Sequence, residues 1–352
     1  MSTKTLVFCD GSVYSPVDPY ATAMVLTETA VDWVGSDAGA DSIYDNSMHK
    51  VELVGDLLTP AFFHGGATVQ SQDELAILSE RLIHAGYAST SLFLPQSACE
   101  SINISASPLH TFVYAIISGK EDIEQLVAGI HGVQIREASV DLTSFLQKAL
   151  DHRLRVSFVP RDEVDIEKFL SALSAFNELD RFRLAPRLDG ISSITSENIC
   201  VARDLGVALG FSSQIAENDS SIRQAVAAGA LVFLGSDVNQ ESRVLGWELA
   251  LTHVVRTRPE DQLSARATFN AMTRGVYRAV GESNPTFGQL GPQSMADVAR
   301  WKVTELMVQT ADDRVAAWST DPRARIPLLP VLEKDNLPAL VDLLIAGQFQ
   351  DV

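Results

Sequence analysis

The sequence predicts a mixed α/β protein, a (β/α)8 TIM-like barrel joined to a small composite β-sandwich domain built from both ends of the chain. Three observations favour this fold. Eight short apolar runs alternate with helical or connecting segments, and such alternation forms a parallel sheet that closes into a barrel at eight units. Further strand-like runs lie at both chain ends. The length of 352 residues also exceeds one barrel and leaves room for a second domain.

The predicted composite domain takes residues 1–58 together with 287–352, and the barrel takes residues 59–286. Short alternating runs separated by turns such as Asp10-Gly11 indicate a small antiparallel sheet at the N-terminus. This sheet is too thin to hold a core alone, so we expect strands near the C-terminus to complete it. The expected strands are 5–9, 23–27, 31–34, 50–53, 298–303 and 341–346.

The barrel elements follow from runs of apolar residues bounded by turn signals and from helical periodicity. The predicted barrel strands are 57–63, 89–94, 110–116, 132–135, 154–159, 181–185, 206–211 and 231–235. The clearer helices are predicted at 72–84, 141–152, 165–179, 220–228, 241–255 and 264–280.

Asp237 follows the last predicted strand, in the run Leu-Val-Phe-Leu-Gly-Ser-Asp. The C-terminal ends of barrel strands carry the chemistry in this fold, which makes Asp237 the best single catalytic candidate. The alternative is structural, because Asp also favours helix caps and turns. The run alone does not decide between the two.

Composition narrows the class of protein. Hydrophobic residues make up 46% and charged residues 20%, as in an ordinary globular protein. The net charge of -18 argues against nucleic acid or an anionic membrane as a partner, since both would be repelled. Three widely spaced cysteines fit a reducing compartment, and neither a signal peptide nor a long apolar span is evident. We therefore expect a cytoplasmic protein.

Several ordered motifs then resemble the metal-dependent amidohydrolases, in particular the YtcJ-like and imidazolonepropionase-like branch. The resemblance covers both ends of the composite domain, the first barrel strand and the last quarter of the barrel, whereas the middle of the chain matches only in its strand–helix rhythm. The motifs are Gly11-Ser-Val-Tyr-Ser-Pro16, Trp33-Val-Gly-Ser36, Gly55-Asp-Leu-Leu-Thr-Pro-Ala-Phe-Phe63, Leu234-Gly-Ser-Asp237, Leu263-Ser-Ala-Arg-Ala-Thr-Phe-Asn-Ala-Met-Thr-Arg274 and Ala296-Asp-Val-Ala-Arg-Trp301.

The resemblance implies a hydrolase acting on carbon–nitrogen bonds, with one or two divalent metals such as zinc activating water at the barrel's C-terminal face. It implies ligands from a His-x-His pair ending the first strand, His residues ending the fifth and sixth strands, and an Asp ending the eighth. The Asp would be Asp237. The His-x-His pair would fall on Gly66 and Thr68, and the His of the sixth strand near Pro186.

None of those three positions carries an imidazole, so the sequence departs from the family pattern. His64 lies two positions early, and in an extended strand it would share a face with Gly66. His64 and Asp237 therefore remain the only candidate metal ligands, and no metal or other cofactor is predicted. The other histidines are not paired at ligand spacing, and we expect structural or exposed roles for them.

Further ligand-binding candidates follow the later strands. We expect Arg161, after the fifth strand, and Arg187, after the sixth, to lie on the rim of the barrel, although salt bridging with neighbouring acids is the plainer role. Asn239 and Arg243 lie just beyond Asp237 and fit either ligand binding or a polar helix start.

Two functional hypotheses follow. The first is a metal-free, catalytically impaired relative, a pseudoenzyme that binds a small molecule or a partner chain, and the missing ligands favour it. The second is an active hydrolase of carbon–nitrogen bonds with Asp237 as general base, which the retained Asp favours. A close approach of His64 and Asp237 would support the second. Barrels of the family it resembles often pair, so a homodimer is a further expectation.

Overall fold

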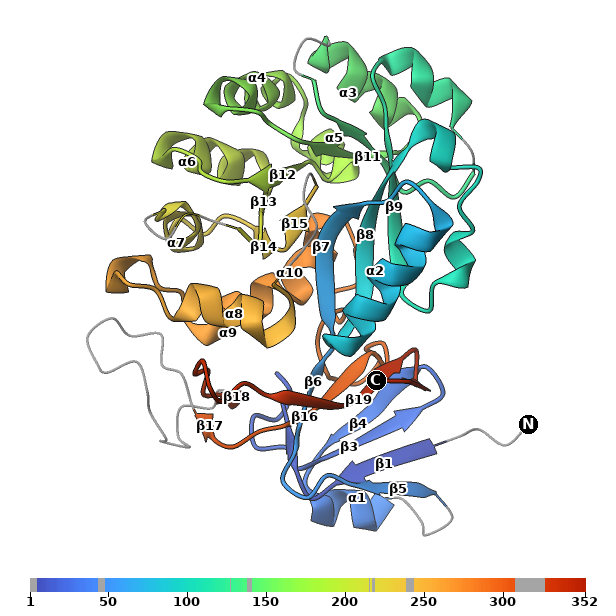
Figure 1. The fold of residues 1–352 in the computed structure, drawn as a ribbon, viewed down its shortest axis with the longest axis vertical. Coiled ribbons are helices and arrows are strands. Elements are labelled where there is room, and N and C mark those ends of the chain that lie inside the picture. The colour runs from blue at the N-terminus through green and yellow to red at the C-terminus, as the bar shows by residue number, and fades with distance from the viewer. Residues whose placement is uncertain are drawn as a thin grey trace.

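The computed structural model describes residues 5–43, 48–126, 128–137, 141–214, 216, 219–238, 244–307 and 327–352. Within this part of the chain, the main sheet has nine parallel strands in the order β14-β13-β12-β11-β10-β9-β8-β7-β15. The end strands β14 and β15 are separated only by Gly235, so the two edges of the sheet meet in a nearly closed barrel (Figure 1). The strands are β7 (Phe62–Thr68), β8 (Tyr87–Pro95), β9 (His110–Ile116), β10 (Gly132–Ile135), β11 (Arg155–Phe158), β12 (Arg187–Ile191), β13 (Ala208–Phe211), β14 (Val232–Leu234) and β15 (Ser236–Asp237).

Helices cover the outside of this barrel (Figure 1). Most begin at a side chain that accepts a backbone N–H, as Ser71 does from Glu74 N and Asp162 does from Asp165 N, which is the usual N-cap arrangement. The apolar faces of the helices up to residue 271 pack on the strands, whereas Val276 and Tyr277 of the last helix belong to the apolar cluster of the barrel interior. The helices are α2 (Gln72–His84), α3 (Leu142–Asp151), α4 (Glu163–Ser174), α5 (Glu178–Leu184), α6 (Ser196–Leu205), α7 (Ser221–Ala227), α8 (Gly246–Val254), α9 (Ala265–Ala271) and α10 (Arg274–Ala279).

The predicted sixth strand at 181–185 is wrong. Residues 181–184 belong to α5 and Ala185 is its C-cap. Asn177 caps the start of this helix by accepting from Asp180 N, and the true strand β12 starts only at Arg187. The predicted helix at 165–179 correspondingly divides into α4 and α5. The acidic first turn of α5 favours a helix at this point, and the strand begins only after Pro186.

Two other predicted elements divide. The predicted strand 57–63 becomes β6 (Leu57–Pro60), which pairs with β16 (Val298–Lys302) outside the barrel, and β7 inside it. The predicted helix 264–280 breaks into α9 and α10 at Met272 and Thr273.

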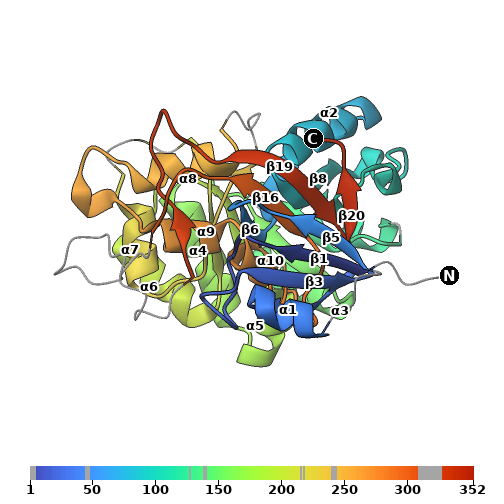
Figure 2. The ribbon, with the colours of Figure 1, turned by 90° about the horizontal axis from the view of Figure 1, so that it is seen from below.

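The residues at the chain ends form two separate sheets rather than one. The first has the order β4-β3-β1-β5, in which β5 is parallel to β1, so it is not wholly antiparallel as predicted. The second has the order β2-β6-β16-β19-β20 and combines both ends of the chain; Figure 2 shows β16 between β6 and β19. The remaining strands are β1 (Thr5–Cys9), β2 (Ser12–Val13), β3 (Ala23–Thr27), β4 (Ala30–Gly35), β5 (His49–Glu52), β19 (Ala339–Ile345) and β20 (Gln348–Gln350).

Both sheets contribute to one buried apolar cluster, which includes Phe8 and Leu26 from the first sheet and Leu58 and Val298 from the second. This common core supports the predicted composite β-sandwich in part. The sheets lie beside the barrel, below it in the view of Figure 1. A short α1 (Asp37–Ile43) and a small pair, β17 (Leu306–Met307) with β18 (Leu329–Pro330), complete the described elements.

An aromatic cluster joins the barrel to the second sheet. The ring of Phe62 in β7 lies between 5.3 and 5.7 Å, centroid to centroid, from the rings of Tyr87, Trp247, Phe269 and Trp301. Trp301 belongs to β16, and its Nε1 donates to Thr59 Oγ1 at 2.9 Å. Trp247 and Trp301 are both buried. None of the helices in the described ranges is long and apolar enough to cross a membrane.

Candidate functional site

A buried ion pair occupies the interior of the barrel. The Arg187 guanidinium donates to the Asp189 carboxylate through Nε at 2.8 Å and Nη2 at 2.5 Å, and both side chains are fully buried. Arg187 also donates to Ser91 Oγ at 3.2 Å and to the carbonyl oxygen of Gly65 at 2.6 Å. Its Cζ lies 4.4 Å from the centre of the Phe233 ring, a cation–π distance. The cation is thus held by charge, hydrogen bonds and an aromatic face.

The Asp189 carboxylate is equally well partnered. Its Oδ2 accepts from Ser157 Oγ at 2.6 Å, and its Oδ1 accepts from Ser236 Oγ at 2.5 Å. With the two bonds from Arg187, these contacts link strands β11, β12 and β15 across the barrel.

The hydrogen bonds continue from Ser157 to the end of β10. Gln134 Nε2 donates to Ser157 Oγ at 3.0 Å, and Arg136 Nε donates to Gln134 Oε1 at 2.8 Å. Arg136 Nη2 then reaches Thr68 Oγ1 at 2.6 Å, and this hydroxyl donates to the carbonyl of Val238. A chain of polar side chains therefore crosses the barrel from Asp189 to Thr68.

The predicted rim position of Arg187 is wrong, because its side chain is fully buried, as is that of Asp189 two residues further along the strand. The error follows from the misplaced sixth strand. In the true strand, Arg-Leu-Asp-Gly-Ile, charged and apolar residues alternate, and side chains two apart face the same side of a sheet. Gln134 and Arg136 alternate with Val133 and Ile135 in the same way, a signal that our sequence analysis missed.

His64 and Asp237 approach each other on the outer side of the barrel wall. His64 Nε2 lies 4.0 Å from Asp237 Oδ2, and both side chains are buried. The neighbours Ser236 and Val238 face the interior, so Asp237, between them, faces outward. His64 contacts the ring of Tyr87, whose hydroxyl accepts from the first N–H of α8. The pair therefore lies between the strands and the helices.

His64 and Gly66 lie on opposite faces of the barrel wall, although an extended strand was expected to place them on the same face. The ladder between β7 and β8 is irregular between His64 and Ala67. Gly66 instead lies against the ring of Phe93, in the apolar cluster of the barrel interior. An irregularity of this kind changes which side chains face inward.

Hydrogen bonds from three donors fix one oxygen of Asp237. Its Oδ1 accepts from Ser212 Oγ, Ser213 N and Ser213 Oγ, each at 2.9 Å. Burial lowers the pKa of His64 from its ordinary 6.5 to about 4, although the Asp237 charge acts in the opposite direction. His64 is therefore a neutral imidazole at pH 7, and its Nδ1 lies 3.3 Å from Thr90 Oγ1.

The residues present do not fit the metal centre that the resemblance implies. Within the described ranges, no group of three or more His, Cys, Asp and Glu side chains is arranged to hold a metal ion. A Cβ atom on Gly66 would lie 2.3 Å from the Phe93 ring, so this ring fills the space of a first-strand ligand. The Arg187 cation in the barrel interior would moreover repel a divalent cation there.

Three further residues, Arg161, Asn239 and Arg243, were predicted as candidates for ligand binding. Arg161 lies on the surface, and its Nε donates to Asp165 Oδ2 at 2.8 Å, which is the structural salt bridge that we considered the plainer role. Asn239 and Arg243 lie outside the described residues.

Neither a family model nor a curated protein sequence matches the chain. Solved structures do match, among them amidohydrolases and other hydrolases. An amidohydrolase from an environmental sample of the Sargasso Sea has a TM-score of 0.72 at 12% identity, covering 98% of this chain and 92% of that one. An atrazine chlorohydrolase mutant from Arthrobacter aurescens TC1, complexed with zinc and atraton, has a TM-score of 0.67 at 15% identity, with coverages of 98% and 94%. Ochratoxinase from A. niger has a TM-score of 0.66 at 13% identity, with coverages of 99% and 96%.

These likenesses extend over nearly the whole chain and show the fold. The protein has the amidohydrolase fold, as the motifs predicted. At such low identity the site residues must be judged from their own geometry.

A second buried histidine, His253, predicts a pH dependence of the stability. Burial, with a smaller contribution from nearby Arg256, lowers the pKa of His253 from its ordinary 6.5 to about 4, and neither ring nitrogen has a hydrogen-bond partner among the described residues. The unfolded chain therefore binds this proton more readily. Above about pH 6.5 His253 is neutral in both states and does not reduce the free energy of unfolding. As the pH falls from 6.5 towards 4, protonation of the unfolded chain lowers the free energy of unfolding by up to about 3 kcal/mol.

We expect His253→Leu to reduce the fall in thermal stability between pH 7 and pH 4.5, measured by circular dichroism melting. Leu has a similar volume and needs no hydrogen bond at this site. His152→Asn, at an exposed helix end, should leave the fall unchanged. Equal pH dependence in His253→Leu and the wild type would contradict this account of His253.

Proposed function

We propose that this protein is a metal-free member of the amidohydrolase fold that binds a small molecule or a partner chain and does not carry out metal-dependent hydrolysis. The observation that carries the proposal is the position of Arg187. Its guanidinium lies in the barrel interior, bonded to Asp189, Ser91 and the Gly65 carbonyl. The sixth barrel strand, β12, which the resemblance expects to end in a ligand His, instead contributes a buried arginine–carboxylate pair.

Energetics support a structural use of this ion pair. Charges taken out of water are tolerated when they are paired and their remaining hydrogen-bonding groups are satisfied. Arg187 and Asp189 meet that condition, since Ser91, Ser157 and Ser236 bond to the pair. The network therefore supports the barrel interior without a metal.

A second candidate is an active hydrolase of carbon–nitrogen bonds with Asp237 as general base. The 4.0 Å separation between His64 Nε2 and Asp237 Oδ2 favours it. Against it, Asp237 faces away from the barrel interior and is buried, and one of its oxygens already accepts three hydrogen bonds. A general base must reach the proton that it abstracts, directly or through a water.

The proposal also covers the domain division, the oligomeric state, the cellular location and the partners of the protein. The chain divides into a composite domain of residues 1–58 with 287–352 and a barrel of residues 59–286. It forms a homodimer, it resides in the cytoplasm, and neither nucleic acid nor a membrane is its partner, in keeping with its net charge of -18.

Elemental analysis of protein purified without chelators tests the proposal. We expect zinc, iron and manganese well below one ion per chain, both in the wild type and in Asp237→Ala, because no group of three candidate ligands comes together among the described residues. Near-stoichiometric metal in the wild type that disappears in Asp237→Ala would overturn the proposal. Asp204→Ala, which removes an exposed carboxylate, is the matched control.

Hydrolase assays on amide, cyclic amide and amidine substrates address the second candidate. Turnover by the wild type that is lost in Asp237→Asn, without any metal, would establish Asp237 as the base. Without turnover, a thermal-shift screen of small molecules is the experiment that finds the ligand.

A further inference from the structure

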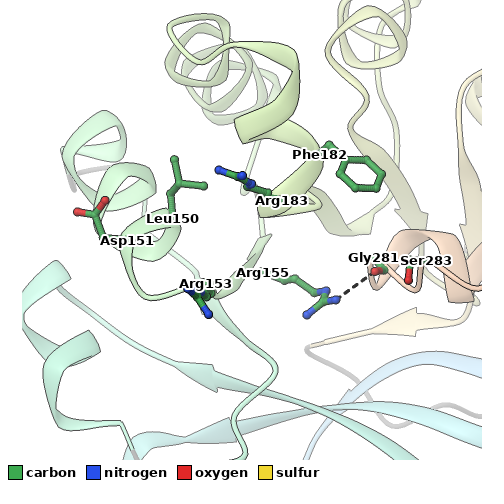
Figure 3. A pocket seen from close by; sticks show the side chains of 8 residues that line it. All are labelled: Leu150, Asp151, Arg153, Arg155, Phe182, Arg183, Gly281 and Ser283. Atoms are coloured by element: carbon green, nitrogen blue, oxygen red, sulfur yellow. Dashed lines mark hydrogen bonds between the residues drawn. The ribbon is translucent and has the colours of Figure 1, made fainter.

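A pocket of about 720 Å³ opens at the N-terminal end of the barrel strands (Figure 3). It lies between the C-terminal ends of α3 and α5, the start of β11 and the segment after α10. Catalytic residues of such barrels lie at the opposite, C-terminal end. The lining residues are Leu150, Asp151, Arg153, Arg155, Phe182, Arg183, Gly281 and Ser283.

Three arginines from two segments of the chain line this pocket. Arg153 follows α3, Arg155 begins β11 and Arg183 lies in the last turn of α5. Asp151 is the acidic residue in the same lining. Since the chain as a whole has 45 acidic and 27 basic residues, this local excess of positive charge runs against its composition. Such a concave basic surface attracts an anion.

Contacts with the protein restrain two of the guanidinium groups. Arg155 Nη2 donates to the carbonyl oxygen of Gly281 at 3.1 Å, as Figure 3 shows. A Cβ on Gly281 would lie 2.6 Å from Arg155 Nε, so the two residues are in close contact. Arg183 Nη1 lies 3.8 Å from Asp180 Oδ1, and Arg183 is otherwise exposed. Each guanidinium has five N–H groups, so both arginines retain donors for a ligand.

Arg153 adopts an unusual backbone conformation. Its φ of 58° places it in the left-handed region, where glycine or asparagine is favoured after a helix. The turn nevertheless carries an arginine, and its side chain is exposed at the pocket. This position sets a third positive charge beside the other two.

Phe182 gives the pocket an apolar side. The residue is 73% exposed, and it lines the pocket next to Arg183. An aromatic ring in contact with water at the edge of a basic pocket provides a surface on which a planar apolar group can stack.

We propose that this pocket binds a small molecule that combines an anionic phosphate group with a planar ring, an aromatic phosphate. The phosphate bonds to Arg153, Arg155 and Arg183, because guanidinium groups bind phosphate oxygens through charge-assisted and often bidentate hydrogen bonds. The ring packs on Phe182. The site lies at the opposite end of the barrel from His64 and Asp237, so it does not depend on the function proposed above.

Isothermal titration calorimetry with phenyl phosphate and with inorganic phosphate tests this site. We expect the wild type to bind both, phenyl phosphate more tightly, and the double variant Arg153→Asn, Arg183→Gln to bind each at least about tenfold more weakly. Asn suits the left-handed conformation of residue 153, and both positions are exposed, so the variant should fold. Phe182→Ala should weaken phenyl phosphate binding and leave inorganic phosphate binding unchanged.

Arg203→Gln is the matched control, because it removes an exposed arginine that pairs with Asp204 away from the pocket. It should bind both probes as the wild type does. The proposal is overturned if the wild type binds neither probe up to about 10 mM, or if Arg203→Gln weakens binding as much as the double variant. Binding of inorganic phosphate alone, unaffected by Phe182→Ala for either probe, would overturn the aromatic part.

Discussion

Arg187→Met should destabilise the protein by about 3–5 kcal/mol, because it leaves the Asp189 carboxylate buried without its cation. Both side chains are fully buried, and the guanidinium provides two of the four hydrogen bonds that Asp189 accepts. Urea denaturation followed by circular dichroism measures the change in the free energy of unfolding. Asp189→Leu should be destabilising to a similar degree for the converse reason.

The double variant Arg187→Met, Asp189→Leu distinguishes two causes of destabilisation, an unpaired buried charge and a change in side-chain volume. With both charges removed, we expect the free energy of unfolding to fall by less than the sum of the falls in the two single variants. The double-mutant cycle then gives the coupling energy between Arg187 and Asp189. Additive effects of the two substitutions would contradict the ion pair. A loss below about 1 kcal/mol in Arg187→Met would show that the barrel interior does not depend on it.

Phe62→Ala should destabilise the protein by about 3–5 kcal/mol, the range typical for truncation of a buried aromatic residue. The Phe62 ring is buried and lies against Trp247 and Phe269 of the helical layer and against Trp301 of the second sheet. Its loss therefore leaves a cavity where the barrel meets that sheet. The change in the free energy of unfolding by urea measures the effect.

Phe62→Leu keeps most of the volume and should lose less than Phe62→Ala. Phe182→Ala is the surface control and should change the free energy of unfolding by no more than about 0.5 kcal/mol, since that ring is 73% exposed. Equal effects of Phe62→Ala and Phe182→Ala would contradict the role of the aromatic cluster.

Local signals in the sequence were sufficient for most individual elements. The predicted ranges 5–9, 23–27, 72–84, 110–116 and 132–135 coincide with β1, β3, α2, β9 and β10. These segments combine a clear hydrophobic period with turns or caps at their ends, and both features act between residues close in sequence. In the segment 181–185 the local signals conflict. Its short run of residues was interpreted as a strand, but the Asn177 cap and the acidic first turn favour the helix α5 that forms there.

The sequence alone determined the fold class, the strand–helix rhythm and the place of Asp237 at the end of the last barrel strand. Only the tertiary structure decided which face each side chain takes. Asp237 faces the helices while Ser236 faces the barrel, and the irregularity after His64 separates it from Gly66. Arg187 and Asp189 are paired within the barrel because strands distant in sequence enclose them. Such facing and pairing arise from contacts between distant segments, which a local pattern does not encode.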